Sequence, residues 1–87
     1  MTPNIHPGEI LREEFMVPLN LSSRKLAAAL DVPAPRINDI VLERRGISAD
    51  TALRLGSYFD TSPRFWMNMQ VSYELKLAEQ NLITAAK

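Results

Sequence analysis

Arg36 and Asn38 are the side chains whose types and spacing best suit the recognition of nucleic-acid bases. An arginine can donate two parallel hydrogen bonds to a guanine edge, and an asparagine can pair in the same way with adenine. Asp39, which follows, accepts a hydrogen bond from cytosine, orients Arg36 or discriminates against the wrong bases. These three residues and Ala34 are therefore predicted to face the bases of DNA. The alternative is that they are ordinary solvated positions of a helix.

A helix, a tight turn and a second helix over residues 22–42 would position these side chains. The apolar residues of both helices recur at three- and four-residue spacing: Leu26, Ala27 and Leu30 in the first, and Ile37, Ile40 and Val41 in the second. Ala27 is small enough for the two helix backbones to cross closely, and Val32 can fill the angle between them. The polar face of the second helix then points outward, where it can enter a major groove.

Basic and hydroxyl side chains lie at both ends of this motif. The chain as a whole has 10 basic and 10 acidic residues, so its net charge gives no indication of nucleic-acid binding. Residues 22–45, in contrast, hold five basic side chains against three acidic ones. Contacts to phosphate are predicted for Ser22, Ser23, Arg24, Arg44 and Arg45. For Arg44 and Arg45 the alternative is a plain polar loop.

Composition excludes several other classes of function. The 87 residues include no cysteine, which removes disulfides, thiolate metal sites and a thiol nucleophile. His6, with Glu9 and Glu13, makes an incomplete metal or catalytic site, so His6 is expected to cap a helix. The sequence shows no charged leader and no long apolar run. We therefore expect one cytoplasmic domain over residues 1–87. No enzymatic activity, metal or cofactor is expected, and no association with a membrane.

Capping signals predict three helices besides the central pair. The first begins after His6 and ends at Pro18, the fourth follows Ser48, and the last opens at Ser62 and Pro63. Within the central pair, Ser22 caps the first helix, and Pro33 and Pro35 are tolerable only in the opening of the second. The sequence therefore predicts an all-α fold of five helices.

The last predicted helix, over about residues 63–82, is apolar on two sides. One stripe consists of Trp66, Met69, Tyr73 and Leu77, and the other of Met67, Val71, Leu75, Ala78 and Leu82. In so small a domain, a surface helix can bury only one of its faces in the core of its own chain. The second stripe is therefore predicted to be the interface of a homodimer. The alternative is that both stripes cover one wide core.

Three segments carry a family resemblance that extends over nearly the whole chain. HPGEILREEF at residues 6–15, RRGISADTALRL at 44–55 and DTSPRFWMNMQVSYEL at 60–75 resemble the HigA-type antitoxins of the phage repressor and Cro superfamily. The resemblance implies a five-helix, lambda-repressor-like DNA-binding domain with a central helix-turn-helix. It also implies a dimer that represses its own operon and neutralises a toxin, commonly a ribonuclease that cleaves messenger RNA.

Two departures from the family pattern concern the helix-turn-helix. Asp31 stands where glycine is frequent, because this position tends to need a positive φ, and aspartate tolerates that conformation better than most residues. Pro33 and Ala34 stand where many relatives have a serine cap and a polar reader, which removes one contact to base or backbone.

Three functional alternatives remain open. One is a stand-alone repressor without a toxin, and another is a protein-interaction module that has lost DNA binding. A repressor that senses a small molecule would need a second domain, of which the sequence shows no sign. For an antitoxin, the acidic first helix with Glu9, Glu13 and Glu14 is the predicted docking face for a basic ribonuclease.

Overall fold

The computed structural model describes residues 4–85, with side chains as far as residue 83. The elements are α1 (Pro7–Ile10), the π-helical segment η1 (Leu11–Met16), α2 (Ser23–Leu30), α3 (Ala34–Val41), α4 (Ala49–Phe59) and α5 (Pro63–Ala85). No strand occurs within these residues. The predicted all-α fold of five helices is confirmed.

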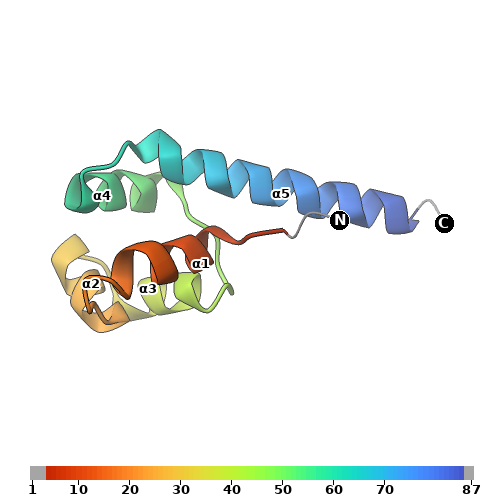
Figure 1. Ribbon diagram of the computed structural model, residues 1–87. Coiled ribbons are helices and arrows are strands. Elements are labelled where there is room, and N and C mark those ends of the chain that lie inside the picture. The colour runs from red at the N-terminus through yellow and green to blue at the C-terminus, as the bar shows by residue number, and fades with distance from the viewer. Residues whose placement is uncertain (1–3, 86–87) are drawn as a thin grey trace.

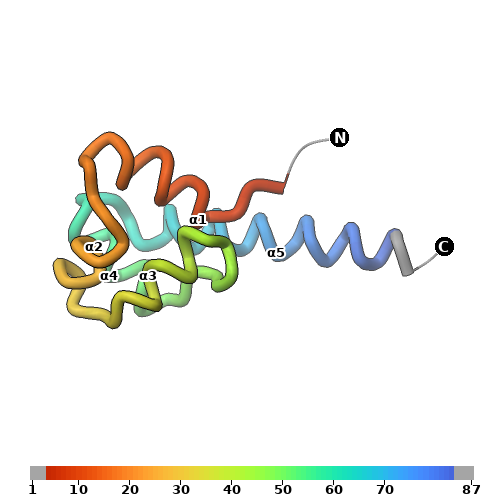
Figure 2. Tube along the Cα trace, turned by 90° about the horizontal axis from the view of Figure 1, so that it is seen from below, coloured from red at the N-terminus to blue at the C-terminus, as the bar shows by residue number. Residues whose placement is uncertain are grey.

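The helices form a compact body from which α5 projects. In Figure 1, α4 and the start of α5 lie above α1, and α2 and α3 lie below it. The second half of α5 runs on beyond the other helices in both Figure 1 and Figure 2. The molecule accordingly measures 46 × 22 × 21 Å along its principal axes. A large part of α5 therefore projects beyond the other described helices.

Side-chain caps fix the start of four helices at the predicted residues. The Nδ1 atom of His6 accepts a hydrogen bond from the Gly8 N–H at 2.9 Å. Burial lowers the pKa of His6, so its ring is neutral at pH 7 and can accept this bond. Serine hydroxyls cap the other three helices: Ser22 with Lys25, Ser48 with Thr51 and Ser62 with Phe65. Each cap satisfies a backbone donor that has no partner inside its helix.

The first helix differs from the prediction, because it leaves the α-helical pattern after Ile10. From Leu11 onward the backbone is π-helical, and the Val17 N–H donates to the Arg12 carbonyl at 2.9 Å. A π-turn adds one residue to the usual repeat. Leu11 and Met16, five residues apart, are consequently both buried. The expected α-helical spacing did not reveal this, since a single wide turn leaves most of the apolar pattern unchanged.

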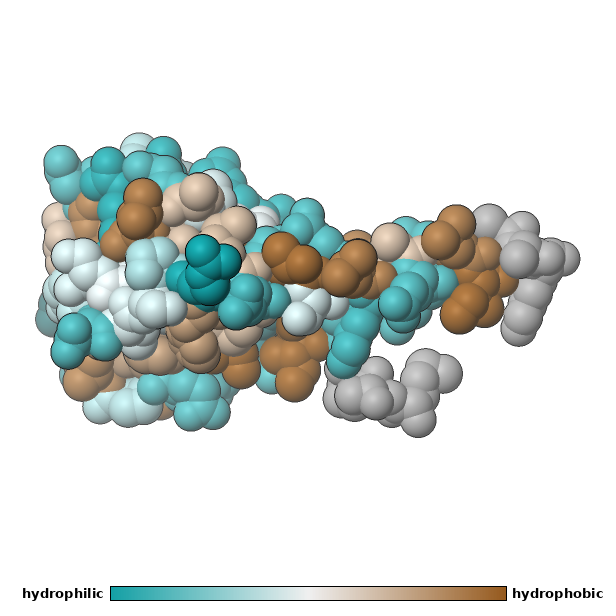
Figure 3. Space-filling view, turned by 90° about the horizontal axis from the view of Figure 1, so that it is seen from above, coloured by the Kyte–Doolittle hydropathy of each residue, from teal (hydrophilic) through white to brown (hydrophobic). Residues whose placement is uncertain are grey.

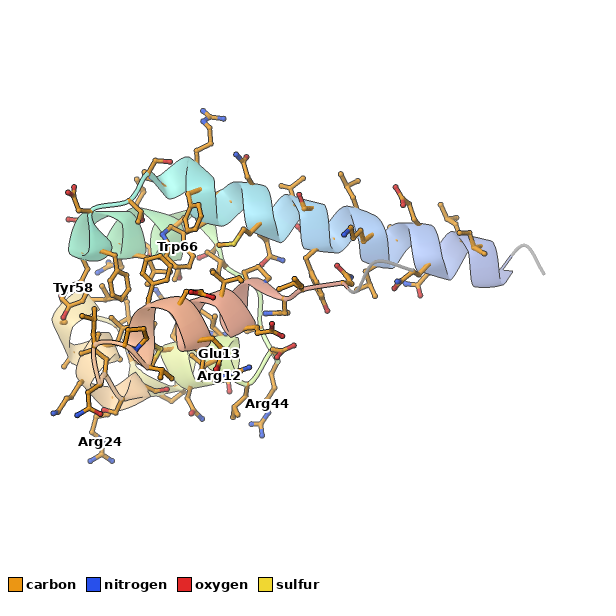
Figure 4. All side chains as sticks on the ribbon, viewed as in Figure 1. Arg12, Glu13, Arg24, Arg44, Tyr58 and Trp66 are labelled. Carbon is orange, nitrogen blue, oxygen red and sulfur yellow. The ribbon has the colours of Figure 1, made fainter. Side chains whose placement is uncertain are left out.

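The core is centred on the two helices of the predicted motif. Their apolar positions Leu26, Ala27, Leu30, Ile37, Ile40 and Val41 are all buried, as predicted. Leu11, Leu55 and Trp66 belong to the same cluster, and each is 0% exposed; Met16, Ile47 and Ala52 complete it. Trp66 points inward from α5 (Figure 4), and its Nε1–H donates to the Thr61 hydroxyl at 2.8 Å. The core thus joins α2 and α3 to the rest of the body.

The inner side of α5 also contains a buried polar residue that the sequence did not reveal. Gln70 is 8% exposed, and its Oε1 atom accepts a hydrogen bond from the Ile47 N–H at 2.7 Å. A Cβ atom on Gly46 would lie 2.6 Å from the Gln70 side chain, so this glycine admits the amide. Leu77, assigned to the core stripe by spacing, is 40% exposed, because the body of the protein ends before the helix does.

Gly8 sets the distance between α1 and α3. A Cβ atom at this position would lie 1.8 Å from the Ile40 carbonyl oxygen, well inside van der Waals contact. We expect Gly8→Ala to force the two backbones apart and to lower the free energy of unfolding by about 1–3 kcal/mol, as overpacking generally does. Urea unfolding followed by circular dichroism measures this change.

Ser57→Ala, at an exposed position of α4, is the control for that experiment. It should change the free energy of unfolding by less than about 0.5 kcal/mol. Equal urea midpoints for Gly8→Ala and the wild-type protein would contradict the close approach of α1 to α3.

Candidate nucleic-acid interface

α3 presents its polar face to the outside of the molecule. Ile37 and Ile40 are buried, Asn38 is exposed, and Arg36 and Asp39 are half-buried. Ala34, the remaining predicted base contact, is half-buried and packs partly against the core. Asn38 is therefore the most accessible of the four predicted base contacts, and Arg36, Asp39 and Ala34 are each half-buried.

The turn between α2 and α3 has the conformation that the sequence indicated. Asp31 ends α2 in the left-handed region, with φ 58° and ψ 48°. The Val32 N–H then donates to the Ala27 carbonyl at 3.0 Å, and Val32 packs against the core. Pro33 precedes α3 in an extended conformation, with no side-chain cap at this helix start. The proline and the missing cap are thus accommodated without loss of α3.

Arg36 is held by an acidic residue from a different helix. Its Nη1 atom lies 2.8 Å from Oδ2 of Asp50, in the first turn of α4. The Nε–H of Arg54 donates to the same oxygen at 3.0 Å. These two arginines, Arg54 first, hold the pKa of the Asp50 carboxyl below its ordinary value. Asp50 is thus ionised at neutral pH.

The alternative role for Asp39, orienting Arg36, is wrong in this structure. Asp39 lies 3.9 Å from both Arg44 and Arg45. The cause is the chain reversal after α3, in which the Arg44 N–H donates to the Asp39 carbonyl at 2.8 Å. This turn brings the two arginines back toward α3. Asp39 therefore neutralises part of the basic loop and makes no ion pair with Arg36.

The residues predicted to contact phosphate lie at both ends of the motif. The side chains of Arg44 and Arg45 are 69% and 51% exposed. Figure 4 shows Arg24 and Arg44 projecting from the lower edge of the molecule, Arg24 below α2 and Arg44 beyond the end of α3. Ser22 is exposed, and Ser23 is half-buried. While Ser22 accepts the capping hydrogen bond, its own O–H can still donate.

Two arginines from outside the motif bind the carbonyls at its helix ends. Arg54 Nη1 donates to the Leu30 carbonyl at 2.7 Å, at the last residue of α2. Arg12 Nη1 donates to the Val41 carbonyl, at the last residue of α3. Cations at helix C-termini satisfy carbonyls that lack partners and complement the helix dipole. Neither contact can be predicted from spacing along the sequence, since both join residues far apart in the chain.

Other kinds of site find no support in the described residues. Within residues 4–83, no group of three or more potential ligand side chains is placed to hold a metal ion. His6, considered above with Glu9 and Glu13, serves as a helix cap. None of the described helices is long and apolar enough to cross a membrane.

Known proteins are similar to this chain in both sequence and fold. The helix-turn-helix family model matches residues 11–66. Virulence-associated protein I of Dichelobacter nodosus is 60% identical over 79 residues, which span 91% of this chain and 73% of that protein.

Two solved structures of antitoxins are similar over nearly the whole length. The Pseudomonas aeruginosa antitoxin HigA with the higBA promoter is 54% identical, with a TM-score of 0.93, and the match covers 98% of this chain and 92% of that one. Antitoxin GraA in complex with its operator is 47% identical, with a TM-score of 0.87, and the match covers 99% and 90%. The chain therefore belongs to the helix-turn-helix family and, within it, to the HigA-type antitoxins.

Proposed function

We propose that this protein is an antitoxin that binds operator DNA as a homodimer, represses its own operon and neutralises a ribonuclease toxin. The observation that carries the proposal is the close match to an antitoxin structure with its promoter, combined with an outward reading face on α3. Such a protein acts in the cytoplasm, where its DNA lies. The three parts of the proposal depend on different surfaces, so they can be tested separately.

DNA binding is assigned to α3 and to the cations that flank it. Near the start of α3, where a recognition helix reaches base edges, Asn38 is exposed and Arg36 is half-buried. Arg24 precedes the turn, and Arg44 and Arg45 follow α3. Figure 4 shows the Arg24 and Arg44 side chains at the lower edge of the molecule. These cations can hold the phosphate backbone on both sides of one groove. Base contacts then supply sequence preference, and phosphate contacts supply the affinity common to all duplexes.

Substitutions should separate these two roles. Arg36→Ala or Asn38→Ala should cost about 1–3 kcal/mol at the operator and leave binding to random duplexes nearly intact. Arg24→Ala or Arg45→Ala should weaken binding to all duplexes and reduce the slope of log K against log salt by about one. Fluorescence anisotropy with both duplexes at several salt concentrations measures these effects.

Equal losses on both duplexes for Arg36→Ala and Asn38→Ala would contradict base reading by α3. A wild-type protein that binds neither duplex would favour the alternative of an interaction module without DNA binding.

Dimerisation is assigned to the second apolar stripe of α5. Val71, Leu75 and Leu82 are 47%, 59% and 70% exposed, which supports an interface at these positions, whereas Met67 packs against the core. Figure 3 shows apolar side chains along the projecting part of α5. Met67 is half-buried and Ala78 exposed at the remaining positions of the stripe. A twofold interface here would present two recognition helices to successive major grooves about 34 Å apart.

Charging the middle of this stripe should separate the two subunits. Val71→Glu combined with Leu75→Lys should give a helical monomer in sedimentation. Its operator affinity should fall by about 10²- to 10⁴-fold, because the second half-site contact is no longer intramolecular. The control is Asn68→Lys with Ser72→Glu, which places the same charges on exposed polar positions of α5. A dimeric Val71→Glu, Leu75→Lys variant would place the interface elsewhere.

Toxin binding is assigned to the acidic face of α1 and η1. Glu13 and Glu14 are exposed and Glu9 is half-buried. Arg12 lies 2.9 Å from Glu13 and 3.7 Å from Glu43, whereas Glu9 and Glu14 form no ion pair with a described cationic side chain. Opposite charge on a basic ribonuclease would speed the encounter and fix its orientation.

Co-expression tests toxin neutralisation. The product of the neighbouring gene should arrest growth when expressed alone, and this chain should relieve the arrest. Glu13→Lys with Glu14→Lys should abolish the relief and leave operator binding in place, because the reading face is untouched. If the neighbouring gene has no effect on growth, the stand-alone repressor is the better assignment. If the double variant still relieves the arrest, the toxin binds another face.

A further inference from the structure

Asp50 connects the recognition helix to α4 through a single carboxylate oxygen. Oδ2 of Asp50 lies 2.8 Å from Nη1 of Arg36 and 3.0 Å from Nε of Arg54. Fourteen residues separate Asp50 from Arg36 in the chain. Arg36 of α3, Asp50 of α4 and the loop between these helices line a hollow of about 390 Å³. The ion pair places the Arg36 guanidinium beside the first turn of α4.

Arg54 anchors this arrangement to the rest of the motif. Its Nη1 atom donates to the Leu30 carbonyl at 2.7 Å and lies 3.4 Å from the Asp31 carbonyl. The end of α2 is thereby linked through Arg54 and Asp50 to the side chain of Arg36. This link places the Asp50 carboxylate relative to the turn of the motif. A carboxylate held in this way restricts the rotamers that Arg36 can adopt.

The contact with Asp50 uses only one end of the Arg36 guanidinium. Within the described residues, Nε and Nη2 of Arg36 have no hydrogen-bond partner. These two groups form one edge of the guanidinium, with parallel donors of the kind that pair with O6 and N7 of guanine. An arginine that is already ordered gives up less conformational freedom when it binds than a mobile one does.

We propose that Asp50 is a positioning residue, which orients Arg36 for base reading and thereby raises sequence discrimination without touching DNA itself. This inference rests on the proposed function, specifically on base contact by Arg36. A carboxylate near DNA also repels phosphate. Removing the charge should therefore leave binding to random duplexes unchanged or stronger, while binding to the operator becomes weaker. A residue with only a structural role would weaken both together.

The test is a double-mutant cycle between Asp50 and Arg36, read as the ratio of operator to random-duplex affinity. The operator is the sequence that the wild-type protein selects from a random pool. Asp50→Asn, which removes the charge at nearly constant size, should lower this ratio by about 5- to 30-fold. In the Arg36→Ala background the same substitution should leave the ratio unchanged. Asp50→Glu, which keeps the charge, should recover part of the lost discrimination.

Asp60→Asn is the matched control, since it makes the same chemical change at the other end of α4. It should leave the affinity ratio at the wild-type value. Arg54→Met tests the anchor and should lower the ratio in the same direction as Asp50→Asn. Circular dichroism and thermal midpoints show whether each variant is folded. If Asp50→Asn is unfolded, Asp50→Ser takes its place in the cycle.

The outcomes distinguish this inference from the proposed function. The positioning role is overturned if Asp50→Asn leaves the ratio of operator to random-duplex affinity unchanged. It is also overturned if Asp50→Asn lowers this ratio equally in the wild-type and Arg36→Ala backgrounds. DNA binding stands in both cases. A specific wild-type protein whose ratio does not respond to Arg36→Ala also overturns it. A wild-type protein with no sequence preference overturns the proposed function and this inference together.

Discussion

The apolar seam between α2 and α3 is the constraint on which the reading face depends. Leu26 and Ala27 of α2 and Ile37 and Ile40 of α3 are at most 1% exposed, so the two helices have little freedom to rotate against each other. Because the apolar face of α3 is buried in this seam, its polar face has to point outward. Gly8 then brings α1 against the α3 backbone from the other side. The orientation of the recognition helix is thus set by burial.

Long polar side chains from the surrounding helices complete the motif. Arg54 binds the last carbonyl of α2, Arg12 that of α3, and Gln70 the backbone N–H of Ile47 in the loop that follows. Each of these groups would otherwise lack a partner inside regular secondary structure. A buried polar group without a hydrogen bond costs about 1–3 kcal/mol, so these contacts also favour one arrangement of the helices over others.

Charge is arranged locally in a protein whose net charge is zero. Asp39 lies between two arginines of the loop after α3, and Asp50 lies between Arg36 and Arg54. Each acidic residue reduces the general attraction to phosphate near the reading face. For a repressor this has a physical advantage, because specificity is the ratio of operator binding to binding at the many other sites of a genome. Weak general attraction raises that ratio when base contacts are retained.

The sequence by itself determined the helices, their caps and the composition of the core. His6, Ser22, Ser48 and Ser62 begin their helices, and Asp31 adopts the positive φ expected of it. These features depend on residues within a few positions of one another, or on an apolar repeat, and both are visible in a linear sequence. The exposure of Asn38 on the polar face of α3 followed from the same periodicity.

Only the tertiary structure decided which partners the polar side chains have. Asp50 rather than Asp39 pairs with Arg36, Gln70 lies buried beside Gly46, and the first helix widens into a π-turn. The two polar contacts join segments distant in the chain, and the π-turn shifts the apolar spacing by a single residue. Spacing along the sequence shows which face of a helix is polar. Which neighbour each polar group finds depends on how the helices pack, and that is settled by burial elsewhere in the molecule.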